Sequence, residues 1–335
     1  MEEEKNESIQ SRRNGGGRAD IGTKEDGAIE EMININERLI TIKEKSIYEF
    51  VLADTLDPER KRPNLPPNMH TKLLDRGSND ELVARTFLTA KTVFNHKHFP
   101  DSINANKALL DVLDVVKELA AMETEIAAYK VEHDKACKSY DERKDSRGFM
   151  LPAIPDMLTR CKTIFQKADQ ACQYLMVVVR VFYPEVGLKQ YYTDFEEMIT
   201  GKYGQNDPFA KFLSQVVPYL MEIRRARNCF DHRKVELKLT GFELQDDNSV
   251  LSPTIEMNDA GSLISRQDLR TYLSDAIEGL VNVTELMIPY LASKHVQPMG
   301  LIPVEVRQVP EDQRRHKMVQ FALWMPIGEE GIYFL

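Results

Sequence analysis

The residues best suited to chemistry lie in one cationic run near the middle of the chain, from Arg224 to Lys234. Within it stand Arg227, Asn228 and His232. A guanidinium group binds phosphate oxygens as a fork and stabilises negative charge as it develops, and a histidine transfers protons near neutral pH. Asn228 and His232 are four residues apart and share one face of a helix, so the amide can orient the imidazole. These side chains therefore have the chemistry that moves a proton beside a bound phosphate.

The spacing of Arg227 and His232 places a condition on such a site. Five residues along a straight helix correspond to a rotation of about 140°, so the two side chains do not converge on one phosphate from a single helix. Two copies of the helix packed across a twofold axis satisfy the condition, because each copy can then face one shared cleft. The spacing therefore favours a composite site in a homodimer.

A long helical pattern delivers the run. It begins at Asp207 and Pro208, an N-cap residue followed by proline at the first helical position. Apolar residues then recur at helical spacing, namely Phe209, Phe212, Leu213, Val216, Val217, Leu220 and Ile223. Pro218 lies inside this helix and is expected to remove one hydrogen bond and bend it.

Composition indicates a globular protein of 335 residues, with 42% hydrophobic and 29% charged residues. The net charge of −9 argues against a broad surface that coats nucleic acid. The four cysteines show no CxxC pairing and are interpreted as free thiols in a reducing compartment. No apolar run reaches the length of about 18 residues that a membrane span needs, and the first residues do not resemble a secretory signal. We therefore predict a cytoplasmic protein without membrane contact.

The whole chain is predicted to be mostly α, with small β-hairpins. Residues 1–31 are predicted to be a disordered tail, and residues 32–145 an N-terminal helical region with helices at about 33–54, 79–94 and 103–141. Residues 150–292 are predicted to form a helical domain, with helices at about 152–183, 191–202, 208–234 and 267–288 and a hairpin insertion at 235–258. Residues 293–335 are predicted to be a tail with a second hairpin, and the charged run before Gly148 to be the domain boundary.

The remaining histidines are interpreted as structural or solvated. His96 and His98 stand close together, but no nearby cysteine or acidic residue completes a metal site. In the last loop, Arg314, Arg315 and His316 are interpreted as a solvated turn. No metal and no cofactor are therefore predicted.

The run Arg227-Asn228-x3-His232 resembles the motif of the HEPN family, an arginine, a polar residue and, after four to six intervening residues, a histidine near the end of a core helix. The helices before the motif, the hairpin after it and the closing helix resemble the family over residues 150–292. The resemblance implies a HEPN-like helical bundle and a homodimer.

The resemblance also implies metal-independent cleavage of RNA, whose ribose 2′-hydroxyl supplies the nucleophile. His232 would be the acid and base, Arg227 the phosphate clamp and Asn228 the orienting residue, while Arg224, Arg225 and Arg233 would bind the RNA phosphates. A role in antiviral defence or as a toxin, with an antitoxin or regulatory protein as partner, follows from the family alone.

Two other interpretations stay open. Cations at a helix C-terminus are stabilised by the helix dipole, so Arg227 or His232 can simply pair with Asp231, Glu222 or an acid on a neighbouring helix. A HEPN-type domain can also serve as a noncatalytic dimerisation, binding or regulatory module. Side chains tied up in internal ion pairs favour this second role, and side chains that point into an open positive cleft favour the enzyme.

Overall fold

A computed structural model describes residues 20–35, 38–143, 150–187, 191–232, 236–259, 262–328 and 331–335. The chain forms two compact units, one of residues 1–110 and 297–335 and one of residues 111–296. Among the described residues about 52% are helical and 20% lie in strands, which form four small antiparallel sheets. The fold is therefore mixed α and β, and the prediction of a mostly α, HEPN-like helical bundle is wrong.

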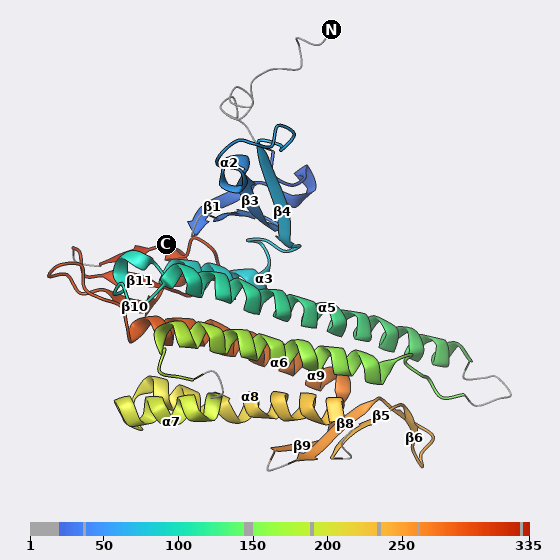
Figure 1. The fold of residues 1–335 in the computed structure, drawn as a ribbon. Helices are drawn as coiled ribbons and strands as arrows, with labels where there is room; N and C mark the ends of the chain where they lie inside the picture. The colour runs from blue at the N-terminus through green and yellow to red at the C-terminus, as the bar shows by residue number, and fades with distance from the viewer. Residues whose placement is uncertain are drawn as a thin grey trace, which may run out of the picture. The chain divides into compact units, whose positions relative to one another are not determined.

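The first unit contains a four-stranded antiparallel meander, with strands in the order β1-β2-β3-β4 (Figure 1). The strands are β1 (Ile29–Ile35), β2 (Arg38–Lys43), β3 (Ile47–Leu52) and β4 (Asn68–Leu74), and a short helix α2 (Ala53–Leu56) follows β3. The buried residues of this sheet include Ile35, Ile40, Ile42 and Ile47.

The prediction of a helix at 33–54 fails on these strands. Its apolar positions matched a helical period, but the segment is rich in isoleucine, a β-branched residue that loses side-chain freedom in a helix and packs well on a pleated sheet. Pairing settles the structure, since Ile33 lies opposite Ile40 and Ile42 opposite Ile47. The N-terminal helical region predicted for residues 32–145 is consequently a sheet in its first part.

The residues just before β1 are tied to the sheet by a buried carboxylate. Asp26, in the 3-10 helix η2 (Lys24–Asp26), accepts hydrogen bonds from Thr23 N at 2.6 Å and Tyr48 Oη at 2.8 Å, and Lys72 Nζ lies 3.1 Å from its other oxygen. The backbone hydrogen bond from Thr23 and the bonds from Tyr48 and Lys72 outweigh burial and hold the pKa of Asp26 well below its ordinary value. Of the predicted tail 1–31, residues 1–19 lie outside the described residues, while residues 20–31 carry η2 and the start of β1.

The rest of the first unit is a helical segment and a second sheet. The helical prediction at 79–94 is confirmed as α3 (Glu81–Val83), the π-helical η3 (Ala84–Leu88) and α4 (Thr89–Val93), followed by the 3-10 helix η4 (His96–His98). The predicted C-terminal hairpin is a three-stranded sheet of β10 (Glu305–Gln308), β11 (Phe321–Met325) and β12 (Ile332–Phe334), with the 3-10 helix η5 (Glu311–Gln313) between β10 and β11. Helix α4 packs against β11.

The second unit is built on long helices that the periodic apolar pattern predicted. They are α5 (Ala105–Arg143), α6 (Met157–Phe182), α7 (Tyr192–Tyr203), α8 (Pro208–His232) and α9 (Leu269–Ser293). Helix α5 begins in the first unit, because the division falls after Leu110. The predicted boundary before Gly148 falls among residues 144–149, outside the described residues. Helices α8 and α9 run through Pro218 and Pro289, so the predicted end of α9 at residue 288 is five residues early.

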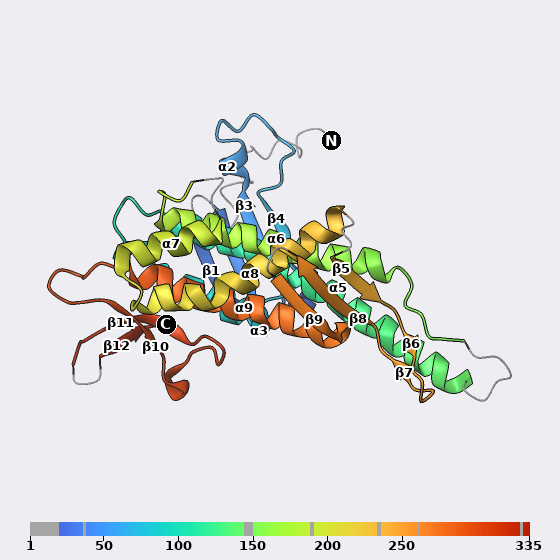
Figure 2. The ribbon, with the colours of Figure 1, turned by 90° about the horizontal axis from the view of Figure 1, so that it is seen from below.

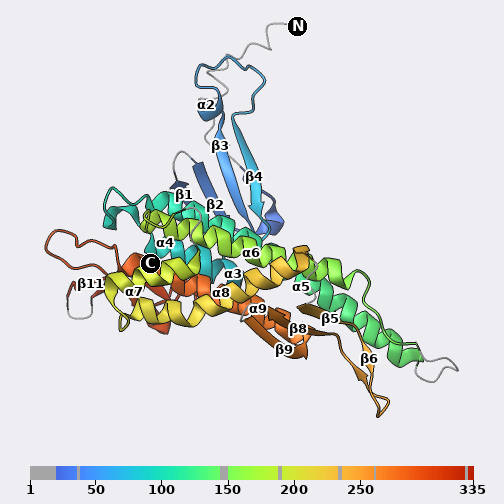
Figure 3. The ribbon, with the colours of Figure 1, turned by 60° about the horizontal axis from the view of Figure 1, so that its bottom comes forward.

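Helix α6 packs against both α8 and α9 (Figure 3). The ring of Phe165 on α6 lies 5.1 Å from that of Phe230 on α8 and 6.0 Å from that of Tyr272 on α9. Tyr219 on α8 donates to the backbone oxygen of Ala276 on α9 at 2.5 Å. These aromatic contacts fix where the end of α8 lies against α6.

Between α8 and α9 the chain forms two small sheets, and the three-stranded one lies beside the C-terminal end of α8 (Figure 2). One consists of β5 (Leu237–Thr240), β8 (Thr254–Asp259) and β9 (Ser262–Asp268) in the order β5-β8-β9, and the other of β6 (Glu243–Leu244) and β7 (Val250–Leu251). The hairpin insertion predicted at 235–258 includes all but β9. The sequence analysis missed β9, which leads directly into α9.

Candidate functional site

The candidate site lies at the C-terminal end of α8, in the second unit. The start of this helix is fixed as predicted, because the Asp207 side chain accepts a hydrogen bond from Phe209 N at 2.9 Å and forms an ion pair with Lys294. Its buried stripe continues to Ile223, Ala226, Cys229 and Phe230, so the residues between them stand on the outer side. Arg224, Arg225, Arg227 and Asn228 are half-buried there, and His232 is exposed.

Arg227 is held by carboxylates of two helices. Its Nε lies 3.0 Å from Asp231 Oδ2, one turn further along α8, and 3.8 Å from Asp169 Oδ2 on α6. The Asp169 side chain is only 4% exposed, whereas that of Arg227 is 35% exposed. Neither Arg227 Nε nor Asp169 Oδ1 has a hydrogen-bond partner among the described residues, so charge rather than an aligned hydrogen bond joins the pair.

Asp231 connects the same two helices. Its Oδ1 accepts a hydrogen bond from Gln166 Nε2 at 3.2 Å and lies 3.2 Å from Lys162 Nζ, both on α6. Burial raises the pKa of Asp231, but the bonds from Lys162 and Gln166 and the charge of Arg227 lower it further, so the net pKa is below its ordinary value. Asp231 is therefore a carboxylate that both helices hold in its ionised form.

Asn228 is joined to the arginine of the motif. Its Oδ1 accepts a hydrogen bond from Arg227 Nη1 at 3.0 Å. That contact fixes the direction of the guanidinium from a second side. The predicted role of Asn228 in orienting His232 stays a prediction. Because α8 is helical as far as His232, Arg227 and His232 point in different directions around it.

The three arginines predicted to bind phosphate differ in their surroundings. The guanidinium carbon of Arg224 lies 4.0 Å from the ring centre of Tyr191, which precedes α7. Arg225 lies on α8 and is half-buried, and Arg233 lies outside the described residues. Arg224 is thus stacked on an aromatic ring, an arrangement that stabilises the cation by its attraction to the ring face.

The sequence analysis missed the residues that α6 contributes, Lys162, Gln166 and Asp169. One signal was present, because Asp169 interrupts the apolar stripe of α6 between Phe165 and Cys172, where an unpaired charge is costly. Glu222, which the sequence offered as a partner for the motif, instead accepts a hydrogen bond from Tyr272 Oη at 3.0 Å.

His98 and His295 lie in packed surroundings, whereas His70 and His96 are exposed. His98 is 7% exposed and its ring lies 5.7 Å from that of Phe334, while His295 lies 4.7 Å from the ring of Tyr183. Within the part of the chain that the structure describes, no group of three or more histidine, cysteine or acidic side chains is placed to hold a metal ion. The four cysteines, all in described segments, form no disulfide.

No protein-family model matches the chain, and no curated protein and no solved structure matches it either. The resemblance to the HEPN family therefore rests on the motif and its neighbouring elements. Over the described residues, no helix has the length and apolarity required to cross a membrane.

Proposed function

We propose that two copies of this chain form a metal-independent endoribonuclease, with one composite active site that uses Arg227, Asn228 and His232. The observation that carries the proposal is the arrangement at the end of α8. There the guanidinium of Arg227 donates to Asn228 and the Arg227 side chain keeps 35% exposure, while His232 is exposed on the same helix end. A guanidinium held in one direction before substrate arrives stabilises charge without reorganising during the reaction.

The chemistry uses groups that RNA and these side chains supply. The imidazole of His232 removes the proton of a ribose 2′-hydroxyl, and the oxygen attacks the adjacent phosphorus. The bond to the 5′-oxygen of the next nucleotide breaks, and that oxygen takes up a proton. The products are a 2′,3′-cyclic phosphate and a 5′-hydroxyl end. Arg227 binds the nonbridging oxygens, whose negative charge grows as the bond forms.

The dimer is part of the proposal because one helix does not bring both side chains to one phosphate. A rotation of about 140° separates Arg227 from His232 on α8. A twofold arrangement lets Arg227 of one copy and His232 of the other face the same strand. In this proposal Arg224, Arg225 and Arg233 bind the flanking phosphates. A role in defence or as a toxin restrained by an antitoxin or regulatory protein belongs to this proposal through the family resemblance alone.

A second candidate is favoured by one specific observation. Arg227 forms ion pairs with Asp231 and Asp169, so much of its charge is neutralised within the chain. A noncatalytic module that dimerises or binds a partner through α8 needs such a cluster only for packing. In that case Arg227 stabilises the helix pair, and the RNA is not cut.

A cleavage assay separates the two candidates. The purified wild-type protein is incubated with a mixed RNA pool in EDTA, beside Arg227→Ala, Asn228→Ala and His232→Ala. Lys211→Ala serves as the matched control, since Lys211 is an exposed cation near the other end of the same helix. The enzyme predicts cutting by wild type and control, a loss of at least 100-fold in Arg227→Ala and His232→Ala, and a smaller loss in Asn228→Ala.

The oligomeric state is measured on the same preparations by sedimentation. A folded wild-type dimer that leaves the RNA intact supports the binding module. Equal cutting by wild type and His232→Ala contradicts the assignment of His232, whatever the oligomeric state.

A further inference from the structure

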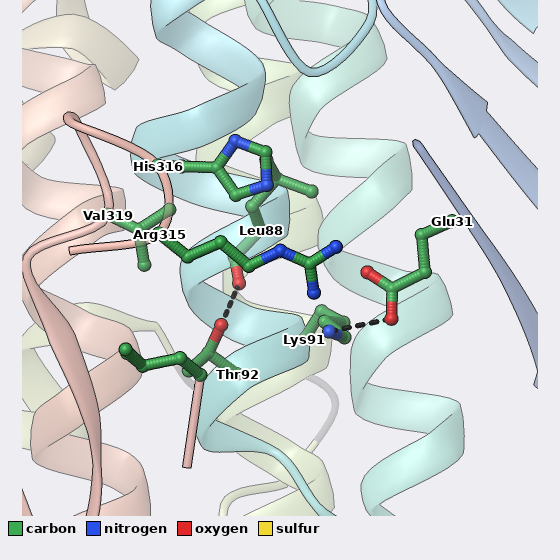
Figure 4. A pocket seen from close by; sticks show the side chains of 8 residues that line it. Glu31, Leu88, Lys91, Thr92, Arg315, His316 and Val319 are labelled. Carbon is green, nitrogen blue, oxygen red and sulfur yellow. Dashed lines mark hydrogen bonds and ion pairs between the residues drawn. The ribbon is translucent and has the colours of Figure 1, made fainter. Parts of the chain in front are cut away.

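A pocket in the first unit gathers charged side chains from three distant parts of the sequence (Figure 4). Glu31 comes from β1, Lys91 from α4, and Arg315 and His316 from the loop before β11. The remaining lining residues are Leu88, Thr92, Val319 and Leu335. In Figure 4 the guanidinium of Arg315 points into the space between His316, Lys91 and Glu31. Arg315 is exposed in a turn, as the sequence predicted, whereas His316 is half-buried, and both side chains line this pocket.

The charges in the pocket do not balance. Lys91 Nζ lies 2.7 Å from Glu31 Oε1, so the carboxylate is engaged with the lysine, and these two side chains are 22% and 27% exposed. Arg315 adds a permanent positive charge, and His316 adds a second one when it is protonated. The lining thus holds one acidic side chain, two permanent cations and one titratable cation, and Glu30, outside the lining, acts on His316 as a second acid.

The pKa of His316 depends first on burial and then on the charges around it. Burial lowers the pKa of His316, and the charges of Arg315 and Lys91 lower it further, while Glu30 and Glu31 raise it. The net pKa is below the ordinary value of a histidine. The two acids therefore leave part of the cost of a third positive charge at this place uncompensated.

The size and lining of the pocket restrict what it can take. Its enclosed part is of the order of one water molecule, so it has room for the head of a ligand and not for a buried ring system. Thr92 is occupied, since its Oγ1 donates to Leu88 O at 2.8 Å, as the dashed line in Figure 4 marks. The polar groups left to meet a ligand are the cations. A guanidinium fork matches the geometry of phosphate oxygens, and an ammonium and an imidazolium can donate to the same group.

We propose that this pocket binds the dianionic head of a phosphate-type ligand, a free phosphate or the terminal phosphoryl group of a phosphate monoester, through Arg315, Lys91 and His316. A monoanion such as a carboxylate neutralises Arg315 alone. A dianion matches Arg315 together with either Lys91 or protonated His316. Binding draws Lys91 away from Glu31, so Glu31 competes with the ligand for the lysine. The site is separate from α8, and its test does not depend on RNA cleavage.

Calorimetric titration with inorganic phosphate tests the proposal on the full chain. Arg315→Gln and Lys91→Gln are each expected to weaken binding about tenfold or more, because each removes one charged hydrogen bond. Glu31→Gln is expected to strengthen binding several-fold, since it frees Lys91. Lys317→Gln is the matched control. Lys317 is an exposed cation in the same loop that does not line the pocket, and its substitution is expected to change affinity less than twofold.

Tighter phosphate binding by Glu31→Gln would show that the variants act on a binding site, because a variant that damages the fold does not bind more tightly. Melting curves of all four variants without phosphate check that each one folds. Two results overturn the proposal. One is the absence of saturable binding by wild type at millimolar phosphate, and the other is an equal loss in Lys317→Gln and Arg315→Gln, which marks diffuse surface attraction.

Ligand class and protonation are tested by competing anions and by pH. Sulfate, a dianion, is expected to compete with phosphate, and acetate is expected to compete at least tenfold less well. Arg315, Lys91, Glu30 and Glu31 are the charged groups that face His316. Because bound phosphate adds negative charge beside them, the imidazole resonances of His316 are expected to titrate at higher pH when phosphate is bound.

An oligonucleotide tests the source of the phosphate. Competition by the 5′-phosphorylated form, and not by the 5′-hydroxyl form, would assign the phosphate to a nucleic-acid end. Competition by neither would assign it to a small molecule. Competition by acetate as strong as that by sulfate would contradict the preference for a dianion.

Discussion

Arg227 on α8 and Asp169 on α6 form an ion pair between two helices, with Nε 3.8 Å from Oδ2. The carboxylate is almost fully buried and also accepts a hydrogen bond from Gln173 Nε2 at 2.6 Å. A buried charge that loses its partner keeps the cost of its desolvation. The motif arginine therefore contributes to the packing of α6 on α8, whatever it does to RNA.

Arg227→Ala is expected to destabilise the protein by about 1–2 kcal/mol, at the low end for a buried pair because the Arg227 side chain is partly exposed. Asp169→Asn removes the buried charge, so the double variant should lose less than the sum of the two single losses. Urea unfolding of all four proteins completes the double-mutant cycle. Strict additivity would show that the two charges do not interact. The same curves show whether lost cleavage in Arg227→Ala reflects lost folding.

His295 is expected to make stability fall in mild acid. Burial and the charge of Lys202 lower its pKa to about 4, against the opposing effect of Glu185. The folded state therefore binds fewer protons than the unfolded state between pH 6.5 and 4, so the free energy of unfolding decreases as pH falls through that window. The difference is about 2–3 kcal/mol across the window. His295→Phe should remove this part of the pH dependence, measured by urea unfolding at pH 7 and 4.5. An unchanged slope in the variant would show that His295 does not titrate in this way.

Glu222 is expected to act with the opposite sign. Burial raises its pKa, while the hydrogen bond from Tyr272 lowers it by less. Its ionised form is therefore disfavoured in the fold, and its contribution to the free energy of unfolding decreases as pH rises above the ordinary glutamate value. Glu222→Gln keeps an oxygen for Tyr272 to donate to and should raise the melting temperature at pH 7 but not at pH 4. Burial and the charge of Glu197 also raise the pKa of Glu196 on α7, so Glu196→Gln tests whether the effect is specific to the α8–α9 contact.

Gly279 on α9 leaves room for Tyr219 of α8. A Cβ at this position would stand 2.9 Å from Tyr219 Oη and 3.0 Å from its Cζ. Alanine favours a helix over glycine by about 1 kcal/mol, whereas overpacking costs about 1–3 kcal/mol. Because Tyr219 is also held by its hydrogen bond to Ala276, we expect Gly279→Ala to destabilise the protein by about 1 kcal/mol net. Gly279→Ala with Tyr219→Phe should recover part of the loss in thermal unfolding, and a stabilised single variant would contradict the close approach.

The long helices were predictable because each carries an apolar stripe at helical spacing along most of its length. Helix α8 shows this well, since Asp207 and Pro208 mark its start and residues from Phe209 to Ile223 keep the period. The motif at the end of α8 was identifiable because its residues are neighbours in the chain. The N-terminal sheet was not predictable from period alone, because Leu39, Ile40 and Ile47 fit either structure and only pairing with distant strands decides between them.

The sequence by itself determined the helical scaffold of the second unit, the identity of the motif and its position at the end of α8, since these depend on residues close together in the chain. Only the tertiary structure decided that Asp169 and Lys162 of α6 stand beside the motif, and that Glu31, Lys91 and Arg315 line one pocket. Each of these groups joins segments far apart in sequence. The spacing of charged residues along the chain does not show which of them will pair, so only the packing of the helices and sheets brings them together.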